Sequence, residues 1–411
     1  MLKRNCMAQT NTNVILAKRC RICHAPLDHT VLDLGEVAIG DALHDGSAVT
    51  RKAPLRLAQC TQCGVLQLQH HLTPESIYNA TYPYFSSNIA SLSDYASQRA
   101  DALIEALDLS RQDAVLEIAS NDGYLLTPFA QMGIPVLGVE PSERQAVRAR
   151  AQGIDTRCEF FDQALATKIR EQSGCFKLVL AHNVVAHTPN VIDFLKGIRA
   201  VLREDGLAII ECHDAEVLID QVQFDTLYHQ HVFYFDAHTL SAVAASTGLH
   251  TQSIERISNY GGSLRLTLSP SKHPTPLPQT HSGISVDRLA NWATAVAQKT
   301  HQLSELIHTL KQSGARIAGY GAAAKGATLL SHCGLDHRHL DYVVDNDPDK
   351  VGLFMPGSMI PIKPSAELDA SPPDHCLILA WNYADEIKAS LTHYQSDGGR
   401  FILPHPEPHI E

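Results

Sequence analysis

Short apolar runs alternate with amphipathic segments through the middle of the chain. Four such runs occupy residues 114–119, 136–140, 177–181 and 207–211. Apolar runs of this length are typical of buried strands, and the amphipathic segments between them are typical of helices. Because strands that alternate with helices pair in parallel through helical crossovers, the pattern predicts a doubly wound α/β sheet.

The hydrophobic pattern changes on both sides of this region. Residues 77–109 carry apolar side chains at three- and four-residue steps, which predicts helix, and the polar and aromatic segment 81–87 interrupts them. That segment is either a surface turn or a lid over a ligand. Residues 269–286 are rich in proline, which predicts an interdomain linker. Apolar runs at residues 316–319, 343–346 and 377–383 then predict a second α/β unit.

The chain has 411 residues, of which 44% are hydrophobic and 19% are charged. This length suggests roughly two to four domains, and the composition is normal for a soluble globular protein. Its apolar runs fall short of the roughly 18 residues that a membrane span needs, and the first residues lack the apolar core of a secretion signal. The formal net charge of −11 repels phosphate polymers. We therefore expect a cytoplasmic protein with neither a membrane nor a nucleic-acid partner.

Four of the ten cysteines stand in two tight pairs near the start of the chain. Cys20 and Cys23 form one C-x-x-C pair, and Cys60 and Cys63 form the other. Two such pairs supply four thiolates for a tetrahedral zinc ion and leave no position for water, so the pattern predicts a structural Zn2+. The remaining cysteines are isolated and are expected to be buried or incidental: Cys6, Cys158, Cys175, Cys212, Cys333 and Cys376.

Polar residues follow the first two predicted strands of the sheet. Asn121, Asp122 and Gly123 end the first strand, and Glu140 ends the second. Ligands of doubly wound sheets bind at these strand ends, where glycine lets the backbone approach and a carboxylate can accept hydrogen bonds from both ribose hydroxyls of an adenosine. The dinucleotide fingerprint G-x-G-x-x-G is absent from this turn. The sequence therefore favours S-adenosylmethionine over NAD.

Histidines and a tyrosine lie close to the ends of the later strands. His187 follows the strand at 177–181, and Tyr228, His229 and His231 follow the strand at 207–211. The pKa of imidazole lies close to neutral pH, which suits a group that removes or donates a proton. We expect a catalytic role for at least one histidine of the segment 224–234.

These motifs together resemble one family. The two C-x-x-C pairs are followed in order by motifs at residues 84–87, 117–123, 138–142, 183–187, 224–231 and 319–326. The series resembles the zinc-containing, SAM-dependent sugar 3-C-methyltransferases that act on TDP-linked 4-ketohexoses, over nearly the whole chain. The resemblance implies a zinc-binding module, a class I SAM-methyltransferase Rossmann-like domain, and a second Rossmann-like domain that helps to hold a nucleotide-linked sugar.

The resemblance also implies boundaries and residue roles. We expect a disordered tail (1–17), the zinc module (18–75), the methyltransferase domain (76–268), the linker (269–286) and the C-terminal domain (287–411). His231 takes the place of the general base, with Tyr228, His187 and Gln230 around it. The implied contacts of S-adenosylmethionine are Tyr84, Phe85, Ser87, Glu117, Asn121, Gly123, Glu140, Pro141, Ser142 and Asn183. The implied contacts of the nucleotide-sugar are Tyr320, Gly321, Lys325 and Asn382.

The chain departs from the family pattern at two places. Gln230 stands where the family usually has glutamate, and residues 259–262 read Asn-Tyr-Gly-Gly where His-Gly-Gly is common. An amide cannot take a proton or stabilise a neighbouring imidazolium by charge, which makes His231 a weaker base. Two alternatives follow: a SAM-dependent methyltransferase with a different acceptor atom or molecule, and a binding protein without catalysis. The second would be expected to lose the adenosyl motifs, which this chain keeps.

Overall fold

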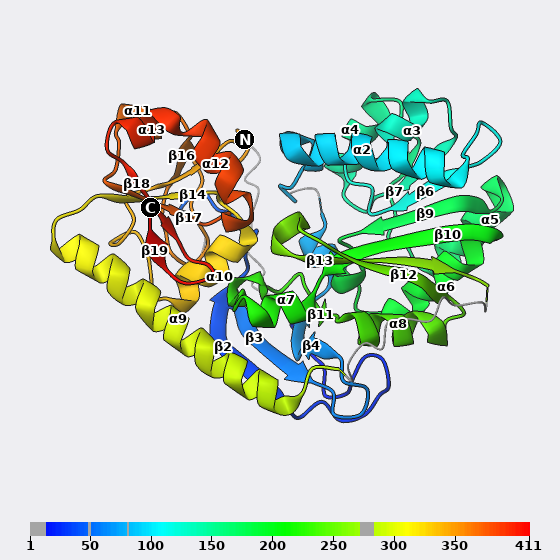
Figure 1. The fold of residues 1–411 in the computed structure, drawn as a ribbon, viewed down its shortest axis with the longest axis horizontal. Coiled ribbons are helices and arrows are strands. Elements are labelled where there is room, and N and C mark those ends of the chain that lie inside the picture. Colours follow the sequence, from blue (N-terminus) through cyan, green and yellow to red (C-terminus); the bar gives the residue numbers. More distant parts are fainter. Residues whose placement is uncertain (1–13, 48–50, 80–81, 272–282) are drawn as a thin grey trace, which may run out of the picture.

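The computed structural model describes residues 14–47, 51–79, 82–271 and 283–411 (Figure 1). The large central sheet and the C-terminal sheet lie side by side, and the N-terminal sheet lies below their junction. One long helix, α9 (Val286–Gln312), runs along the N-terminal and C-terminal parts. No helix among the described residues is long and apolar enough to cross a membrane.

The N-terminal module consists of two small antiparallel sheets. β1 (Val14–Leu16) pairs with β5 (His70–Leu72), while β2 (Thr30–Ala38), β3 (Lys52–Gln59), β4 (Leu66–Leu68) and the distant β11 (Phe233–Tyr234) form the second sheet in the order β11-β4-β3-β2. The expectation of a disordered tail up to residue 17 is therefore wrong for residues 14–16, whose backbone pairs with β5. Residues 1–13 lie outside the described residues.

The central sheet has the strand order β12-β13-β10-β9-β6-β7-β8. Its strands are β6 (Val115–Ile118), β7 (Val136–Val139), β8 (Thr156–Arg157), β9 (Phe176–His182), β10 (Leu202–His213), β12 (His250–Ile257) and β13 (Ser263–Ser269). Strands β6 to β10 run parallel, and β13 is inserted antiparallel between β10 and β12. The predicted doubly wound sheet is confirmed.

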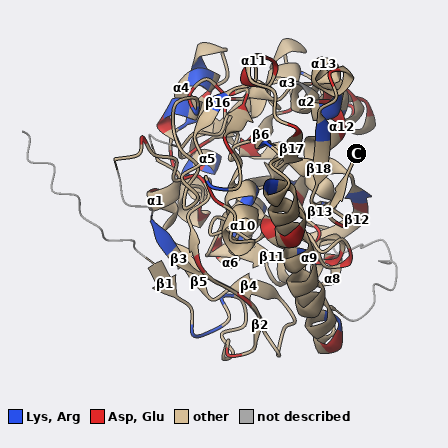
Figure 2. Cartoon of the chain, turned by 90° about the vertical axis from the view of Figure 1, so that its left-hand side faces the viewer, with Lys and Arg blue, Asp and Glu red and all other residues tan. Residues whose placement is uncertain are grey.

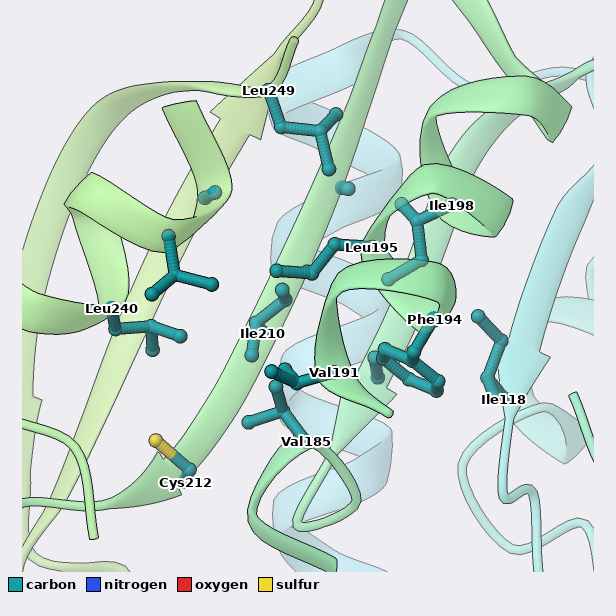
Figure 3. Close-up of a cluster of buried hydrophobic side chains, with 14 of the residues drawn as sticks. Ile118, Val185, Val191, Phe194, Leu195, Ile198, Ile210, Cys212, Leu240 and Leu249 are labelled. Atoms are coloured by element: carbon teal, nitrogen blue, oxygen red, sulfur yellow. The ribbon is translucent and has the colours of Figure 1, made fainter. Parts of the chain in front are cut away.

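Helices cover both faces of this sheet. They are α2 (Ala90–Leu107), α3 (Thr127–Gln131), α4 (Glu143–Ala151), α5 (Gln163–Ser173), α6 (Val191–Val201) and α8 (Ala237–Ser246). Two further helices complete this part of the chain: α1 (Pro74–Ile77), which has no buried residue, and α7 (Ala215–Asp220), whose buried residues lie in one cluster with α9. On one face, Leu195 of α6 points towards Ile210 of β10, and Phe194 of the same helix lies beside Ile118 of β6, in a cluster that also includes Leu240 of α8 (Figure 3). On the other, residues of α2, α3 and α4 form a separate buried cluster. Because neighbouring side chains of a strand point to opposite faces, the parallel strands β6, β7, β9 and β10 contribute to both clusters.

The C-terminal body is a second parallel α/β sheet with the order β16-β15-β14-β17-β18-β19. Its strands are β14 (Ile317–Tyr320), β15 (Val343–Asp345), β16 (Ile362–Pro364), β17 (His375–Ile378), β18 (Arg400–Leu403) and the antiparallel β19 (His409–Ile410). Its helices after α9 are α10 (Ala324–His332), α11 (Glu367–Ala370), α12 (Ala384–Ser390) and α13 (Thr392–Ser396). The second α/β unit is therefore present. Residues 272–282 of the predicted linker lie outside the described residues.

Helix α9 joins the N-terminal module, the part that contains the central sheet, and the C-terminal body through an apolar stripe along one of its faces. Leu289, Trp292, Val296, Leu303 and Ile307 are buried at the spacing of one helix face. They belong to a cluster that also contains residues of β2, β3, α7, α10 and the C-terminal sheet. Since this one core includes side chains from all three parts of the chain, packing fixes where the ends of the two large sheets meet.

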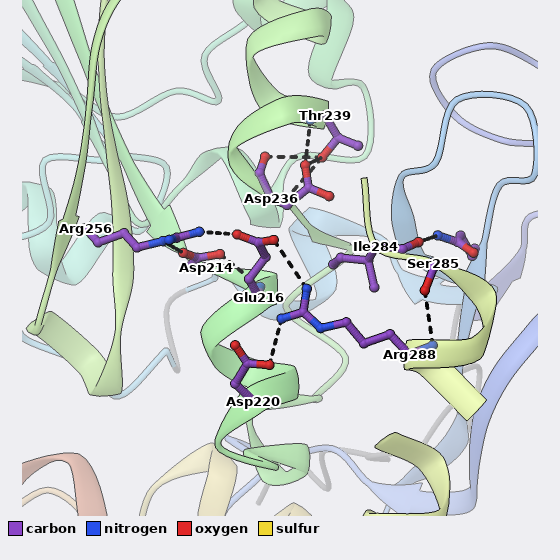
Figure 4. Close-up of polar contacts among 10 residues, drawn as sticks. Asp214, Glu216, Asp220, Asp236, Thr239, Arg256, Ile284, Ser285 and Arg288 are labelled. Carbon is purple, nitrogen blue, oxygen red and sulfur yellow. Dashed lines mark hydrogen bonds and ion pairs between the residues drawn. The ribbon is translucent and has the colours of Figure 1, made fainter. Parts of the chain in front are cut away.

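Ion pairs add to this attachment at the start of α9. Arg288 of α9 pairs with Asp220 at 2.7 Å and with Glu216 at 3.3 Å, and both acids lie on α7 (Figure 4). Glu216 also pairs with Arg256 of β12, which reaches the buried Asp214 at 2.8 Å. On another side of the molecule, Arg144 of α4 pairs with Asp349, so that α4 lies beside the C-terminal body (Figure 2).

Candidate active site

The four paired cysteines converge in the N-terminal module. Their sulfur atoms all lie within 4.8 Å of one another, with Cys20 and Cys63 at 3.6 Å and Cys23 and Cys60 at 3.4 Å. A tetrahedral zinc ion with Zn–S bonds of about 2.3 Å requires sulfur atoms about 3.8 Å apart, so the residues fit zinc. The side-chain amide of Gln67 donates to the Cys20 sulfur at 3.1 Å, as partners of metal ligands commonly do.

The loop that follows β6 has a strained backbone. Ala119 and Asn121 have positive φ angles of 58° and 49°, and Gly123 has a φ of 80°. A side chain at position 123 would also lie 3.1 Å from Ile154. Non-glycine residues in this region of φ/ψ space cost free energy and gather at ligand sites. The loop is therefore held in a conformation that brings its backbone to the end of the sheet.

Glu140, which ends β7, organises this loop. Its two carboxylate oxygens accept hydrogen bonds from the backbone N–H groups of Asn121 at 3.0 Å and Ser142 at 2.8 Å. Burial raises the pKa of Glu140, and the bonds from Ser142 and Asn121 act in the opposite direction. Because a carboxylate offers about four acceptor positions, capacity remains for two hydroxyl donors.

Glu117 of β6 is a buried acid with no cation of its own. It is 1% exposed, and its Oε2 atom has no hydrogen-bond partner among the described residues. Burial, followed by the charges of Asp122 and Glu140, raises its pKa well above the ordinary value. Asp122, by contrast, pairs with Arg148 at 3.6 Å. A buried carboxyl group without a partner fits a positively charged ligand, and S-adenosylmethionine carries both a sulfonium and an ammonium group.

The aromatic segment after residue 82 covers this loop. Ser87 donates to Asp122 at 2.6 Å, the backbone N–H of Ser86 donates to the Asn121 side chain at 2.9 Å, and that side chain donates to the Tyr84 carbonyl at 3.2 Å. Phe85 is buried, and the guanidinium groups of two arginines of α4 lie 4.9 Å and 5.3 Å from its ring. Of the two interpretations offered above, this packing contradicts an exposed surface turn and agrees with a cover over the strand ends.

His231 lies at the centre of a cluster of rings. Its Nε2 atom is 2.8 Å from the Tyr228 hydroxyl, and its ring lies 4.6 Å from that of His187 and 5.6 Å from that of His213. The His187 Nδ1 atom contacts the Tyr78 hydroxyl at 2.9 Å. We call these five residues, Tyr78, His187, His213, Tyr228 and His231, the histidine–tyrosine cluster.

The histidines of this cluster are neutral at neutral pH. Burial, followed by the neighbouring His187, His213 and Lys325, holds the pKa of His231 well below 6.5. Burial also lowers the pKa of His187 to about 4 and that of His213 to about 3. A neutral imidazole has a free lone pair, so His231 can accept a proton. His229 lies apart from the cluster, since its Nε2 atom contacts the Ala53 carbonyl at 3.1 Å.

The C-terminal body contributes the start of α10 to the same region. Lys325 donates to the Asn382 side chain at 2.8 Å, and its ammonium group lies 4.3 Å from the centre of the Trp381 ring. Burial lowers the pKa of Lys325 to about 8, against the opposing charge of Asp225. Tyr320 is buried at the end of β14, and Gly321 has a φ of 95° with no room for a side chain beside Ala380.

The structure therefore brings most of the expected residues together in two groups. The first group, which we call the donor group, consists of Glu117, Asn121, Gly123 and Glu140 around the ends of β6 and β7. It also includes Asn183, which has a φ of 52° and ends the neighbouring β9. The second group is the histidine–tyrosine cluster with Lys325 and Asn382. Sequence reasoning missed Tyr78 and His213. His213 ends β10 and could have been found from its position at a strand end, whereas nothing in the sequence marked Tyr78.

This fold and these two groups define a class I SAM-dependent methyltransferase with a structural zinc site. Family models support the same assignment in three parts: a zinc binding domain matches residues 20–78, a methyltransferase domain matches 91–254, and a C-methyltransferase C-terminal domain matches 258–406. The C-methyltransferase NovU of Streptomyces niveus is 30% identical over 404 residues, which cover 95% of this chain and 96% of that protein. The chain belongs to this family of C-methyltransferases.

Other similar proteins match a smaller part of the chain. A ubiquinone biosynthesis O-methyltransferase of Bradyrhizobium diazoefficiens is 30% identical over 123 residues, 28% of this chain and 46% of that protein. Among solved structures, magnesium protoporphyrin IX methyltransferase of Synechocystis with bound SAM aligns with a TM-score of 0.32 and 14% identity. That alignment covers 42% of this chain and 79% of the other.

Proposed function

We propose that the protein transfers the methyl group of S-adenosylmethionine to carbon 3 of a nucleotide-linked 4-keto sugar. The observation that carries this proposal is the neutral His231, which is hydrogen-bonded to Tyr228 and close enough to Lys325 of the C-terminal body for that charge to lower its pKa. A small acceptor held between two α/β bodies can meet a base from one and binding groups from the other. The membership in a C-methyltransferase family supports transfer to carbon.

The neutral His231 suits proton removal from a carbon acid. A ketone at carbon 4 acidifies the proton on carbon 3, and an imidazole lone pair within reach can take that proton. The negative charge that develops on the ketone oxygen needs a donor or a cation nearby, and the hydroxyls of Tyr78 and Tyr228 and the ammonium group of Lys325 supply these. When bound, S-adenosylmethionine supplies a methyl group on a positively charged sulfur.

The donor group then holds its ligand in a fixed position. In this proposal Glu140 accepts hydrogen bonds from the ribose hydroxyls, and Glu117 balances the positive charge of the methionine part. Asn121, Gly123 and Asn183 shape the backbone beneath the ligand. The remaining expected contacts, Tyr84, Phe85, Ser87, Pro141 and Ser142, surround the same strand ends. Alignment of carbon, methyl and sulfur is a large part of what such a site can contribute to the rate.

In this proposal the C-terminal body binds the nucleotide part of the acceptor. The turn at Tyr320 and Gly321 leads into α10, whose first backbone N–H groups suit a phosphate. Lys325 and Asn382, already hydrogen-bonded to each other, lie between this turn and the histidine–tyrosine cluster. The sugar attached to the nucleotide then extends towards His231.

A methyl-transfer assay tests the proposal. The protein is incubated with S-adenosylmethionine and a panel of TDP-linked 4-keto sugars, and products are analysed by mass spectrometry and NMR. We expect a gain of one methyl group on carbon 3. A methyl group on oxygen or nitrogen would establish the alternative acceptor chemistry suggested by Gln230. Binding of S-adenosylmethionine without any transfer to these sugars would contradict the proposal.

A further inference from the structure

A carboxylate of the N-terminal module contacts the segment 224–234, which carries Gln230 and His231. Asp41 follows β2, and its Oδ2 atom accepts a hydrogen bond of 2.8 Å from the side-chain amide of Gln230, a residue 189 positions away. Gln230 is adjacent to His231, and its backbone carbonyl contacts the His187 Nδ1 atom at 2.8 Å. The zinc module therefore reaches the histidine–tyrosine cluster through Asp41.

Close packing fixes the loop that carries Asp41. A side chain at the preceding residue, Gly40, would lie 2.7 Å from the Cα atom of Ala324, the first residue of α10. Only a glycine permits this approach of two backbones. Asp41 is thereby held beside the start of α10, where the next residue is Lys325.

The contact with Asp41 also orients the amide of Gln230. A carboxylate accepts hydrogen bonds, so the amide nitrogen must face Asp41 and the Oε1 atom must point elsewhere. Gln230 is 3% exposed, and this Oε1 atom is buried with no hydrogen-bond partner among the described residues. A buried carbonyl oxygen without a partner is costly, which indicates that a ligand supplies the donor.

The negative charge of Asp41 contributes to the raised pKa values of four tyrosines in and near the histidine–tyrosine cluster. Burial raises the pKa values of Tyr78, Tyr82, Tyr84 and Tyr228, and the charge of Asp41 adds to the shift of each. Burial likewise raises the pKa of Asp41, against the opposing effects of Lys350 and of the hydrogen bond from Gln230. Asp41 therefore lies among the aromatic residues of the site.

We propose that Asp41 and Gln230 form a carboxylate–amide pair that binds a hydroxyl group of the acceptor, with Asp41 supplying the negative charge. The inference rests on the proposed function and adds a specificity-determining residue to it. It also accounts for Gln230, which stands where the family usually has glutamate. In this chain Asp41, on the loop after β2, already supplies a carboxylate at that place. A glutamate at position 230 would put two like charges in contact.

An exchange of the two groups tests this inference. In Asp41→Asn the pair keeps its shape and loses its charge, and we expect kcat/KM for the TDP-linked 4-keto sugar to fall by about 10- to 100-fold. In the double variant Asp41→Asn, Gln230→Glu the amide and the carboxylate exchange places. We expect it to recover to within about fivefold of the unmodified protein, while the Kd for S-adenosylmethionine stays unchanged in both.

Asp45→Asn is the matched control, since Asp45 is exposed on the same loop; it should leave kcat/KM unchanged. Full activity of Asp41→Asn, or a double variant no more active than Asp41→Asn, would overturn the inference and leave the proposed function standing. If the unmodified protein binds S-adenosylmethionine and methylates none of the keto sugars, the proposed function itself fails, and the inference falls with it.

Discussion

Replacing His231 with asparagine is expected to lower kcat for methyl transfer by about 10²- to 10⁴-fold, the usual contribution of a positioned general base. Asparagine keeps a polar side chain of moderate size and cannot accept the proton from carbon. The donor group lies on other strand ends, so the Kd for S-adenosylmethionine should stay within about twofold. Single-turnover assays and calorimetric titration of the same preparations separate the two effects.

The pH dependence of the unmodified protein gives a second measurement of the same residue. The pKa of His231 is held well below 6.5 by burial, with His187, His213 and Lys325 adding to the effect. The imidazole is active as a base only when neutral, that is, above its own pKa. We therefore expect kcat/KM to fall below pH 6.5 as His231 becomes protonated. It should also fall as the pH approaches 8, because Lys325, whose pKa burial lowers to about 8, then loses its ammonium charge.

A histidine outside the cluster serves as the control. His238 is exposed at the start of α8, and His238→Asn should retain full activity. A loss of less than tenfold in His231→Asn, or a midpoint of the acid limb at or above pH 6.5, would contradict the assignment of His231 as the base.

The central sheet could be predicted because its strands are buried on both faces. Buried parallel strands read as continuous apolar runs, and the runs at 114–119, 136–140 and 177–181 match β6, β7 and β9. The prediction of 207–211 missed the first half of β10, which begins at Leu202, because its residues 203–206 are polar or glycine. β11 was missed because two residues carry no periodic signal, and only their pairing with β4 defines them.

The sequence could predict those residues of the candidate site that follow the parallel strands of the central sheet. Asn121, Glu140 and Asn183 each end a parallel strand, and such ends meet at one edge of the sheet. Asp41 and Tyr78 reach the site from the N-terminal part through tertiary packing, and neither stands at the end of a strand of the central sheet. Their approach depends on the packing of the N-terminal module against the other two bodies, which no local pattern encodes.

The zinc module carries Asp41, which contacts Gln230 beside the histidine–tyrosine cluster. β11, which lies at the end of the segment 224–234, is a strand of the module's own sheet. The zinc ligands stabilise the module, the module carries Asp41, and the C-terminal body carries Lys325. The position of Asp41 beside the start of α10 therefore depends on the packing of the module against the C-terminal body.

The second large effect is expected at Asp225, a fully buried acid of the segment 224–234. Its Oδ2 atom accepts from the Trp381 indole at 2.6 Å, and its Oδ1 atom lies 2.8 Å from His405 Nε2, both in the C-terminal body. Lys299 of α9 contacts His405 Nδ1 at 2.9 Å. Since an ammonium group only donates, Nδ1 accepts, and the Nε2–H group donates its hydrogen bond to Asp225 Oδ1.

In Asp225→Asn the new amide nitrogen must face either the indole N–H or the imidazole N–H, and a donor then meets a donor. The buried Lys325 and Lys299 also lose the charge opposite them. Breaking a buried pair of this kind costs about 3–5 kcal/mol. For a chain of 411 residues, that corresponds to a fall in Tm on the order of 3–6 °C by calorimetry.

The matched control is Asp220→Asn, which removes the surface ion pair with Arg288 (Figure 4). Asp220 is 59% exposed, so this change should cost about 0–1 kcal/mol. A fall in Tm no larger for Asp225→Asn than for Asp220→Asn would show that the buried acid does not hold the bodies together.

Acid should reduce the difference between Asp225→Asn and the unmodified protein. Burial raises the pKa of Asp225, but His405, Lys325 and Trp381 outweigh it, and the net pKa is lowered from 3.8. A carboxylate whose pKa is lower in the folded state stabilises that state above its unfolded pKa, and this contribution is lost as the pH falls through the folded value. The two Tm values should therefore differ most at neutral pH and converge below about pH 4. A constant difference across this range would mean that the variant acts through packing, with the charge of Asp225 making no contribution.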